Sequence, residues 1–338
     1  MTRVLLVTDA NADYENRSIA ARITGATDPR IACSGHTLPP AGAMPHVMHR
    51  LMRRERQEEF DVIHAIGPAS LTAVLPVGCQ PIVYSPPGDQ PLRGLSRLRW
   101  VSLARRVIVA AGSEAVRREL LAAGVPADCT RVVTLAPRIS SPQPLSRAQL
   151  GLSDQHKVLL AVGESHRRSN HRLAAWAGVI MWFFDPNYRT LIWGRGPMGD
   201  IIRRFVADLR RPGFCIFAED AAGHALDWPA VAALADLAIF AATKPTGLYA
   251  ARVCQQLGVP VIAAPSPGAL ELEASNLAIS DSPRARVLAQ TIYHATVNGA
   301  LRRQPPRPVD PDDDLSPWVR LYEDAVVGRP EQPASLTG

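Results

Sequence analysis

The chain has 338 residues, of which 47% are apolar and 20% charged, with a net charge of +6 and a pI near 9.4. This composition supports packed cores and excludes a globally disordered chain, and the length suits two domains. The longest nearly continuous apolar stretch, 173–184, is shorter than the roughly 20 residues that a membrane-spanning helix needs. The N-terminus opens on a strand-like run, Val4–Thr8, rather than on a secretory signal, so we expect a cytoplasmic protein.

The N-terminal half alternates short apolar runs with helical patterns. After the strand at 4–8, strands are predicted at 61–65, 81–84, 105–110 and 131–135, and helices at 17–23, 48–60 and 114–123. Ser113 stands at the N-cap position of the helix at 114–123, and Gly124 stands where that helix should end. Strands that alternate with helices in this way indicate a parallel sheet.

The C-terminal half repeats this alternation after a break in composition. Residues 137–146 contain three prolines and three serines, which indicates a linker. Beyond it, strands are predicted at 158–163, 188–193, 235–240 and 258–263. A proline-rich, acidic connector at 305–314 leads to a last amphipathic helix at 318–327.

We therefore predict an α/β protein made of two doubly wound, Rossmann-like domains, with a ligand in the cleft between them. The expected parts are a first domain at 1–140, a second domain at 147–308, a terminal helix at 315–328 and a disordered tail at 329–338. In such sheets ligands bind at the carboxyl ends of the strands.

Basic and glycine-rich turns follow the strands of the second half. Arg167 and Arg168 come after the strand at 158–163, and their guanidinium groups suit a diphosphate as well as a solvated loop. Gly194 and Gly196 belong to a Gly-Arg-Gly-Pro turn that would let a ligand or a neighbouring helix approach the backbone. Two tryptophans of the helical pattern before Phe184, Trp176 and Trp182, fit a core position better than a sugar-stacking one.

In their order and spacing, several segments resemble the retaining, nucleotide-sugar-dependent glycosyltransferases of the two-Rossmann-domain (GT-B) type, group 1 or family 4. The segments that carry the resemblance are Asp61–His64, Ser113–Leu120, Gly124–Pro126, Ala148–Leu152, Gly194–Pro197, Ala235–Phe240, Gly258–Ala263 and Gly268–Glu271. The resemblance implies an acceptor-side domain at 1–140, a nucleotide-sugar-donor domain at 147–308, and sugar transfer with retention. It also implies that neither a bound metal nor another cofactor is required.

The resemblance implies a donor-binding role for several residues. Thr246, Gly247 and Leu248 stand where the family's backbone meets the donor phosphates, and a helix N-terminus there would bind an anion. Glu271 would contact the donor's ribose or cap a helix. His64 would be a catalytic residue that contacts a sugar, or alternatively a histidine of the core.

The resemblance also implies phosphate-binding cations after the first strand of the donor domain, and here the chain departs from the family. Glu164 occupies the position of the family's arginine, and the position of its lysine falls near Ser169 or Asn170. Arg167 and Arg168 are close enough in sequence to supply the charge instead.

A second departure concerns the family's two donor-binding acids. No glutamate occurs between Lys244 and Gly258. Counted back from Gly258, Pro245 and Val253 stand in the places of the two acids, whereas counted from Gly247 and Leu248, Lys244 and Arg252 do. The fold resemblance is therefore stronger than the catalytic one.

Two functions from different classes remain open, with a third disfavoured. The first is a glycosyltransferase that uses a UDP-, GDP- or ADP-sugar and an unidentified acceptor. The second is a catalytically inactive homologue that acts as a binding or partner subunit. A nucleotide-sugar epimerase is disfavoured because acid and base residues do not cluster. The arginine pairs fit a peripheral contact with an anionic membrane as well as solvated helix faces, and no nucleic-acid partner is expected.

Overall fold

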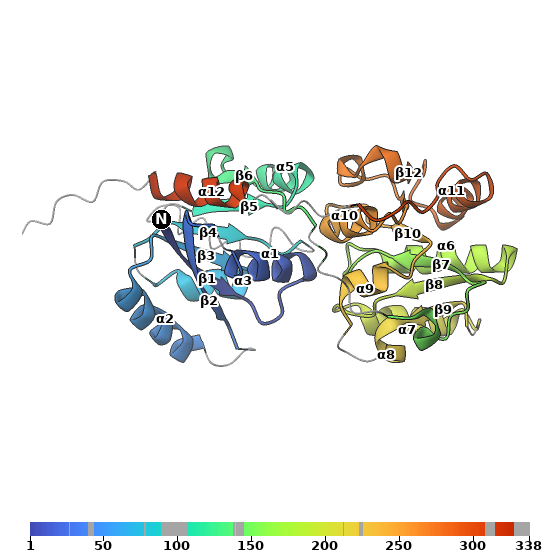
Figure 1. The fold of residues 1–338 in the computed structure, drawn as a ribbon, viewed down its shortest axis with the longest axis horizontal. Coiled ribbons are helices and arrows are strands. Elements are labelled where there is room, and N and C mark those ends of the chain that lie inside the picture. The colour runs from blue at the N-terminus through green and yellow to red at the C-terminus, as the bar shows by residue number, and fades with distance from the viewer. Residues whose placement is uncertain are drawn as a thin grey trace, which may run out of the picture. The chain divides into compact units, whose positions relative to one another are not determined.

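The computed structural model describes residues 1–26, 28–39, 44–77, 79–88, 107–137, 139, 145–211, 213–222, 226–307 and 315–327. The chain forms two compact units, one made of Met1–Leu135 and Asp314–Gly338 and the other of Ala136–Asp313. Each unit has its own parallel sheet (Figure 1), and each has its own core of buried side chains.

The first unit contains a six-stranded sheet in the order β2-β1-β3-β4-β5-β6. Its strands are β1 (Thr2–Thr8), β2 (Ile31–Thr37), β3 (Val62–Ile66), β4 (Ile82–Ser85), β5 (Val107–Ala111) and β6 (Thr130–Val132). Its helices are α1 (Tyr14–Thr24), α2 (Met44–Glu58), α3 (Pro68–Val74), α5 (Glu114–Ala122), the short η1 (Ala127–Cys129) and α12 (Ser316–Val327). Every strand pairing described in this unit is parallel.

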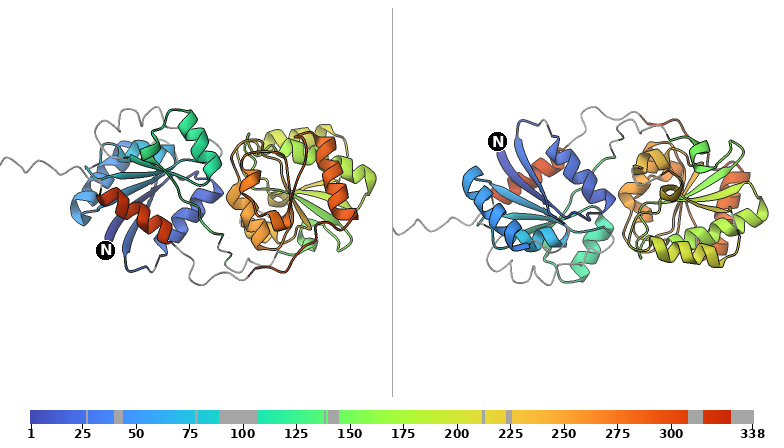
Figure 2. Two further views of the ribbon diagram at one scale, coloured as in Figure 1. Left: turned by 90° about the horizontal axis from the view of Figure 1, so that it is seen from above. Right: turned by 90° about the horizontal axis from the view of Figure 1, so that it is seen from below.

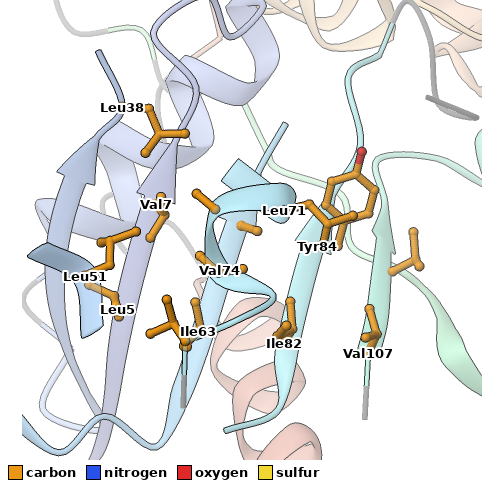
Figure 3. Close-up of a cluster of buried hydrophobic side chains, with 14 of the residues drawn as sticks. Leu5, Val7, Leu38, Leu51, Ile63, Leu71, Val74, Ile82, Tyr84 and Val107 are labelled. Atoms are coloured by element: carbon orange, nitrogen blue, oxygen red, sulfur yellow. The ribbon is translucent and has the colours of Figure 1, made fainter. Parts of the chain in front are cut away.

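The core of the first unit lies between this sheet and the helices that cover it. Strand β3 is buried at every position, as expected for a parallel sheet covered on both faces. Figure 3 shows Ile63, Ile82 and Val107 of three neighbouring strands on one side of the sheet, where Leu71 and Val74 of α3 lie over them. The apolar runs of the sequence are therefore explained by burial rather than by alternating exposure.

Helix α12 packs on the first unit although it comes at the end of the chain. It contacts β1, β3 and β4 (Figure 2). Trp318 and Tyr322 provide the buried face of the helix, with exposed fractions of 1% and 0%. The first unit is thus assembled from both ends of the sequence.

The second unit contains a six-stranded sheet in the order β12-β11-β10-β7-β8-β9. Its strands are β7 (Lys157–Ala161), β8 (Tyr188–Ile192), β9 (Cys215–Phe217), β10 (Leu237–Phe240), β11 (Val261–Ala263) and β12 (Leu277–Ile279). Its helices are α6 (His171–Phe184), α7 (Gly199–Asp208), α8 (Ala218–Ala222), α9 (Trp228–Ala232), α10 (Leu248–Gln256), α11 (Ala285–Val297) and the short η2 (Arg147–Leu150), η3 (Ala269–Glu271) and η4 (Ala274–Asn276). Its described strand pairings are also parallel.

These findings confirm the predicted fold class of two α/β, Rossmann-like domains. The predicted linker at 137–146 is described only at 137, 139, 145 and 146, and the predicted tail at 329–338 lies outside the described residues. Within the described ranges, we find no helix with both the length and the apolarity that membrane crossing requires.

Candidate functional site

Three loops meet at the carboxyl edge of the second sheet, because β10, β7 and β8 are neighbours there. They follow β7, β8 and β10 and lead into α6, α7 and α10. Backbone hydrogen bonds join the first two loops: Ser165 N–H donates to the Arg195 carbonyl at 2.5 Å, and Met198 N–H donates to the Ser165 carbonyl at 2.8 Å. All the donor-side residues predicted from the sequence lie on these loops, on the start of α10 or on η3.

The Gly-Arg-Gly-Pro turn after β8 holds this junction together. Gly196 has a φ of +117°, and a Cβ at this position would lie 2.6 Å from the carbonyl oxygen of Ser165. Gly194 also has a positive φ, +95°, and a Cβ there would lie 3.2 Å from side-chain atoms of Arg203 and Glu219. Both glycines are therefore needed for close packing of the protein on itself, which is the structural one of the two roles the sequence allowed.

The loop after β7 is fixed from inside by a buried histidine. His171 Nε2 lies 2.9 Å from the carbonyl of Val162, so this nitrogen carries the proton. Ser165 Oγ, 2.8 Å from His171 Nδ1, therefore donates its hydroxyl hydrogen to that nitrogen. Burial lowers the pKa of His171 to about 4, which keeps the imidazole neutral. The pair acts as an internal brace for the loop.

The acid at the family's arginine position does not face this edge as an isolated charge. Glu164 Oε2 lies 3.0 Å from His166 Nε2, and the two side chains are only 7% and 12% exposed. Ser169 Oγ donates to the backbone carbonyl of Glu164 at 2.7 Å. The carboxylate that would repel a diphosphate is thus held against an imidazole in the same loop.

The two arginines predicted to bind the donor lie in the next part of this loop. Arg167 is exposed and Arg168 is half-buried. The loop ends at Asn170, which precedes α6 in a left-handed conformation with a φ of +54°. Asn170 Nδ2 donates to the carbonyl of Ala241 at 3.4 Å, which links this loop to the one after β10.

The loop after β10 supplies a further cation and a helix N-terminus. Lys244 is exposed, whereas Thr246 is 5% exposed. Gly247 is the N-cap of α10, with a φ of +66°, and makes no side-chain capping bond. The first amide groups of α10 therefore concentrate positive potential beside Lys244. Sequence reasoning did not include Lys244 in the site, although its position at a strand end was a signal.

Glu271 lies on η3, in a half-buried ion pair with α10. Its Oε2 is 4.0 Å from a guanidinium nitrogen of Arg252, and the side chains are 21% and 19% exposed. The N-cap of η3 is Gly268, with no side-chain capping bond, so Glu271 does not cap this helix. Helix α10 thus has no acidic residue of its own, but an acid of η3 faces it.

His64 lies in the core of the first unit and is fully buried. Its Nδ1 is 2.8 Å from the hydroxyl of Tyr322, its Nε2 is 2.9 Å from Ser85 Oγ, and its ring stacks on Trp318 at 5.2 Å. Burial lowers its pKa to about 3. Since both ring nitrogens are occupied within the core, we place His64 outside the proposed site.

The described residues hold no cluster of three or more His, Cys, Asp and Glu side chains able to bind a metal ion. The side chains of His166, His171 and Asp185 each have a partner within the protein. His171 braces its loop, His166 pairs with Glu164, and Asp185 accepts from Lys157 Nζ at 2.8 Å.

Comparison with solved structures shows that the chain has the GT-B fold, shared by glycosyltransferases and nucleotide-sugar epimerases. Anabaena Alr3699/HepE, solved in complex with UDP-glucose, is 16% identical, with a TM-score of 0.65 over 97% of this chain and 94% of that one. Sucrose-phosphate synthase from Thermosynechococcus elongatus is 17% identical, with a TM-score of 0.61 over 97% of both chains.

An epimerase shows a comparable likeness. UDP-GlcNAc 2-epimerase from Neisseria meningitidis, solved with UDP-GlcNAc bound, is 11% identical, with a TM-score of 0.56 over 96% of this chain and 100% of that one. No protein-family model matches the sequence, and comparison with curated proteins gives no significant match. At these identities the likeness establishes the fold alone.

Proposed function

We propose that this protein binds a nucleotide-sugar at the carboxyl edge of its second sheet and transfers the sugar to an acceptor. One observation carries the proposal. Arg167, Arg168, Lys244 and the N-terminus of α10 lie on adjoining loops at the edge where parallel α/β sheets bind ligands. Similar folds solved with UDP-glucose and UDP-GlcNAc support a nucleotide-sugar as the ligand.

In this proposal each loop meets a different part of the donor. The amides of Thr246, Gly247 and Leu248 would bind a phosphate, with Arg167 and Arg168 on the other side of the diphosphate. Glu271 would accept hydrogen bonds from the ribose hydroxyls. Gly196 would act indirectly, by letting the loop after β8 lie against the loop that carries the arginines, and Gly194 by letting the same turn lie close to Arg203 and Glu219.

The reaction would break the bond between the anomeric carbon and the diphosphate, with the bonding electrons leaving on the phosphate oxygen. Negative charge then grows on the diphosphate, so cations and helix amides stabilise the transition state more than the ground state. An acceptor hydroxyl bound by the first unit would form the new glycosidic bond at the anomeric carbon and pass its proton to the leaving diphosphate. Retention at the anomeric carbon, a family 4 affiliation and a cytoplasmic location are parts of the proposal that rest on the sequence resemblance.

A second candidate function is a catalytically inactive partner or binding subunit. The observation that favours it is the charge exchange at the site. Glu164 stands where the family has an arginine, and Lys244 and Arg252 stand, by one count, where it has acids. An enzyme must retain nucleotide affinity, whereas a scaffold can lose it.

Nucleotide affinity therefore separates the two candidates. We expect UDP, GDP or ADP to raise the melting temperature in a dose-dependent manner, because a ligand that binds only the folded state stabilises it. The double variant Arg167→Ala, Arg168→Ala should weaken this rise. The matched control Arg117→Ala, Arg118→Ala removes an arginine pair from α5 of the first unit and should leave it unchanged.

The absence of a shift with every nucleotide at millimolar concentration would contradict the enzyme and support the partner subunit. A shift that both double variants reduce equally would mean that the arginines of the loop after β7 do not form the site. If a nucleotide binds, its sugar conjugate is the substrate to test. Chromatographic analysis of the sugar product distinguishes transfer from epimerisation.

A further inference from the structure

Helix α6 exposes aromatic side chains on its outward side, and helix α7 exposes an isoleucine. Trp176 and Phe183 of α6 are 44% and 61% exposed, and Ile201 of α7 is 52% exposed. The sequence suggested that Trp176 belongs to the core, but its position on the outward side of α6 overturns this. The small residues Ala174 and Ala177 occupy the inward side, because they let the helix lie close to the sheet.

These exposed side chains are not scattered over the two helices. Positions 172, 176 and 183 fall on one stripe of α6, and 201 and 205 fall on one stripe of α7. The ring of Trp176 lies 5.6 Å from that of Phe205, so the two helices share the surface. We define this α6–α7 face by Arg172, Trp176, Phe183, Ile201, Phe205 and Arg211.

Arginines are interleaved with the aromatic rings. The guanidinium of Arg172 lies 4.8 Å from the centre of the Phe205 ring, and that of Arg211 lies 5.1 Å from the centre of the Phe183 ring. Helix α6 contains no acidic residue, and the neighbouring α11 contains none either. On and just after α7, Arg204, Arg210 and Arg211 accompany the acids Asp200 and Asp208. The face is therefore positively charged overall.

We propose that the α6–α7 face docks the protein on an anionic phospholipid membrane. Indole and phenyl rings partition to the interface between headgroups and acyl chains, where one end of the side chain is apolar and the other wet. A guanidinium that lies over such a ring keeps N–H groups at its edge that can donate to lipid phosphates. The interleaved pattern satisfies both requirements over one surface.

A second copy of this chain fits the face less well than a lipid surface does. A symmetric dimer pairs the same patch on both subunits, so the arginines of one copy would meet those of the other. Like charges that face each other in this way oppose association. An anionic bilayer complements the same charges and accommodates rings without a shaped pocket.

Vesicle binding by the full chain tests this inference. We expect co-sedimentation with vesicles of phosphatidylcholine and phosphatidylglycerol in equal parts, little with phosphatidylcholine alone, and weakening by salt. Trp176→Ala with Phe183→Ala, and separately Arg172→Glu with Arg211→Glu, should each weaken binding by roughly tenfold or more. Entry of Trp176 into the membrane interface should shift tryptophan emission toward the blue. Trp176→Phe should bind like the unchanged protein but lose part of this shift.

The control variant carries the same kinds of change on exposed residues of the first unit, Arg118→Glu with Val132→Ala, and should bind like the unchanged protein. Equal loss in this control would overturn the assignment to the α6–α7 face. Equal binding to both kinds of vesicle, or to neither, would overturn the proposal.

If vesicles do not bind and light scattering shows a dimer that Trp176→Ala with Phe183→Ala dissociates, the face joins two copies and the membrane proposal fails. Should that variant not fold, the arginine variant alone decides. The nucleotide-dependent melting shift, measured without vesicles, stays an independent test of the proposed function, because no residue of the α6–α7 face belongs to the nucleotide site.

Discussion

The two sheets have the same kind of carboxyl edge but opposite chemistry on it. In the first unit, acids of the chain itself occupy this edge. Asp9, directly after β1, accepts from the backbone amides of Ala69 and Ser70 at the start of α3, at 3.1 and 2.5 Å. Asp13 accepts from the amide of Gly88, after β4, at 2.7 Å. The positive end of α3 is therefore already neutralised.

In the second unit, the corresponding edge has cations and a helix start without a side-chain cap. Gly247 makes no side-chain bond to α10, and Lys244 stands just before it. The one acid on the loop after β7, Glu164, is paired with His166. The fold thus supplies the same amide-rich edge twice, and a few side chains decide which edge can accept an anion.

The largest expected effect concerns the close contact that shapes the second edge. Gly196→Ala should lower the free energy of unfolding by about 3 kcal/mol or more, because the added Cβ meets the Ser165 backbone and the φ is unfavourable for alanine. Gly124→Ala is the matched control, since its φ is also positive, +88°, but no atom lies within 4 Å of the added Cβ. It should cost only about 1 kcal/mol in urea unfolding. Equal losses would show that the contact with Ser165 is unimportant.

One buried histidine in each unit should make the stability of the protein depend on pH. Burial lowers the pKa of His64 to about 3 and that of His171 to about 4, both from an ordinary value of 6.5. The unfolded chain takes up protons at a higher pH than the folded chain does. The free energy of unfolding is therefore highest above about pH 6.5 and falls as the pH drops toward the pKa values of the folded state. When the pH is lowered from 7 to 5, each histidine should reduce the free energy of unfolding by about 2 kcal/mol.

Urea unfolding at several pH values measures this slope. His64→Gln and His171→Gln should each reduce it, whereas His294→Gln, on the exposed side of α11, serves as the control. An unchanged slope in both buried variants would contradict the assignment of neutral, buried imidazoles to the two units.

Removal of the acid that neutralises the first edge should have a smaller effect. Asp9→Ala should lower the free energy of unfolding by about 1–2 kcal/mol, because the amides of Ala69 and Ser70 lose their acceptor. Asp9→Asn keeps an oxygen acceptor and should lose less. Urea unfolding of both variants measures the difference, and a neutral effect of Asp9→Ala would mean that water satisfies these amides equally well.

The smallest effect on stability is expected at the second edge. Lys244→Ala should leave unfolding nearly unchanged but weaken nucleotide binding by roughly tenfold, because an exposed cation beside α10 is lost. Isothermal titration with the nucleotide identified by melting measures the change. Lys157→Ala is the control, since Lys157 begins β7 at the opposite edge and pairs with Asp185. Equal affinities in the two variants would remove Lys244 from the site.

The interior of both sheets was predictable from sequence, and of their four border strands only β6 was predicted, at 131–135. The predicted strands at 158–163, 235–240 and 258–263 correspond to β7, β10 and β11, which are buried apolar runs. Strands β2, β9 and β12 were missed, and all three lie at the edge of a sheet. Edge strands are paired on one side only, so they are half-buried and lack a continuous apolar run.

In the candidate site, the loops could be predicted from the sequence but the partners of their side chains could not. Strand ends and glycine turns can be read from sequence, so the loops after β7, β8 and β10 were located correctly. The partners of their side chains could not be read, because contacts such as Gly196 with Ser165 or Arg252 with Glu271 join residues far apart in the chain. For the same reason the core position of His64 depended on Tyr322, which is 258 residues away.

The return of α12 to the first sheet affects the order in which the protein can be made. Ribosomal synthesis releases every residue of the second unit before Trp318 and Tyr322 emerge. Until then His64 and the strands beneath α12 lack their cover, so the first unit cannot complete its fold before the whole second unit has been synthesised. The unit that begins first along the chain is therefore the last to be fully synthesised.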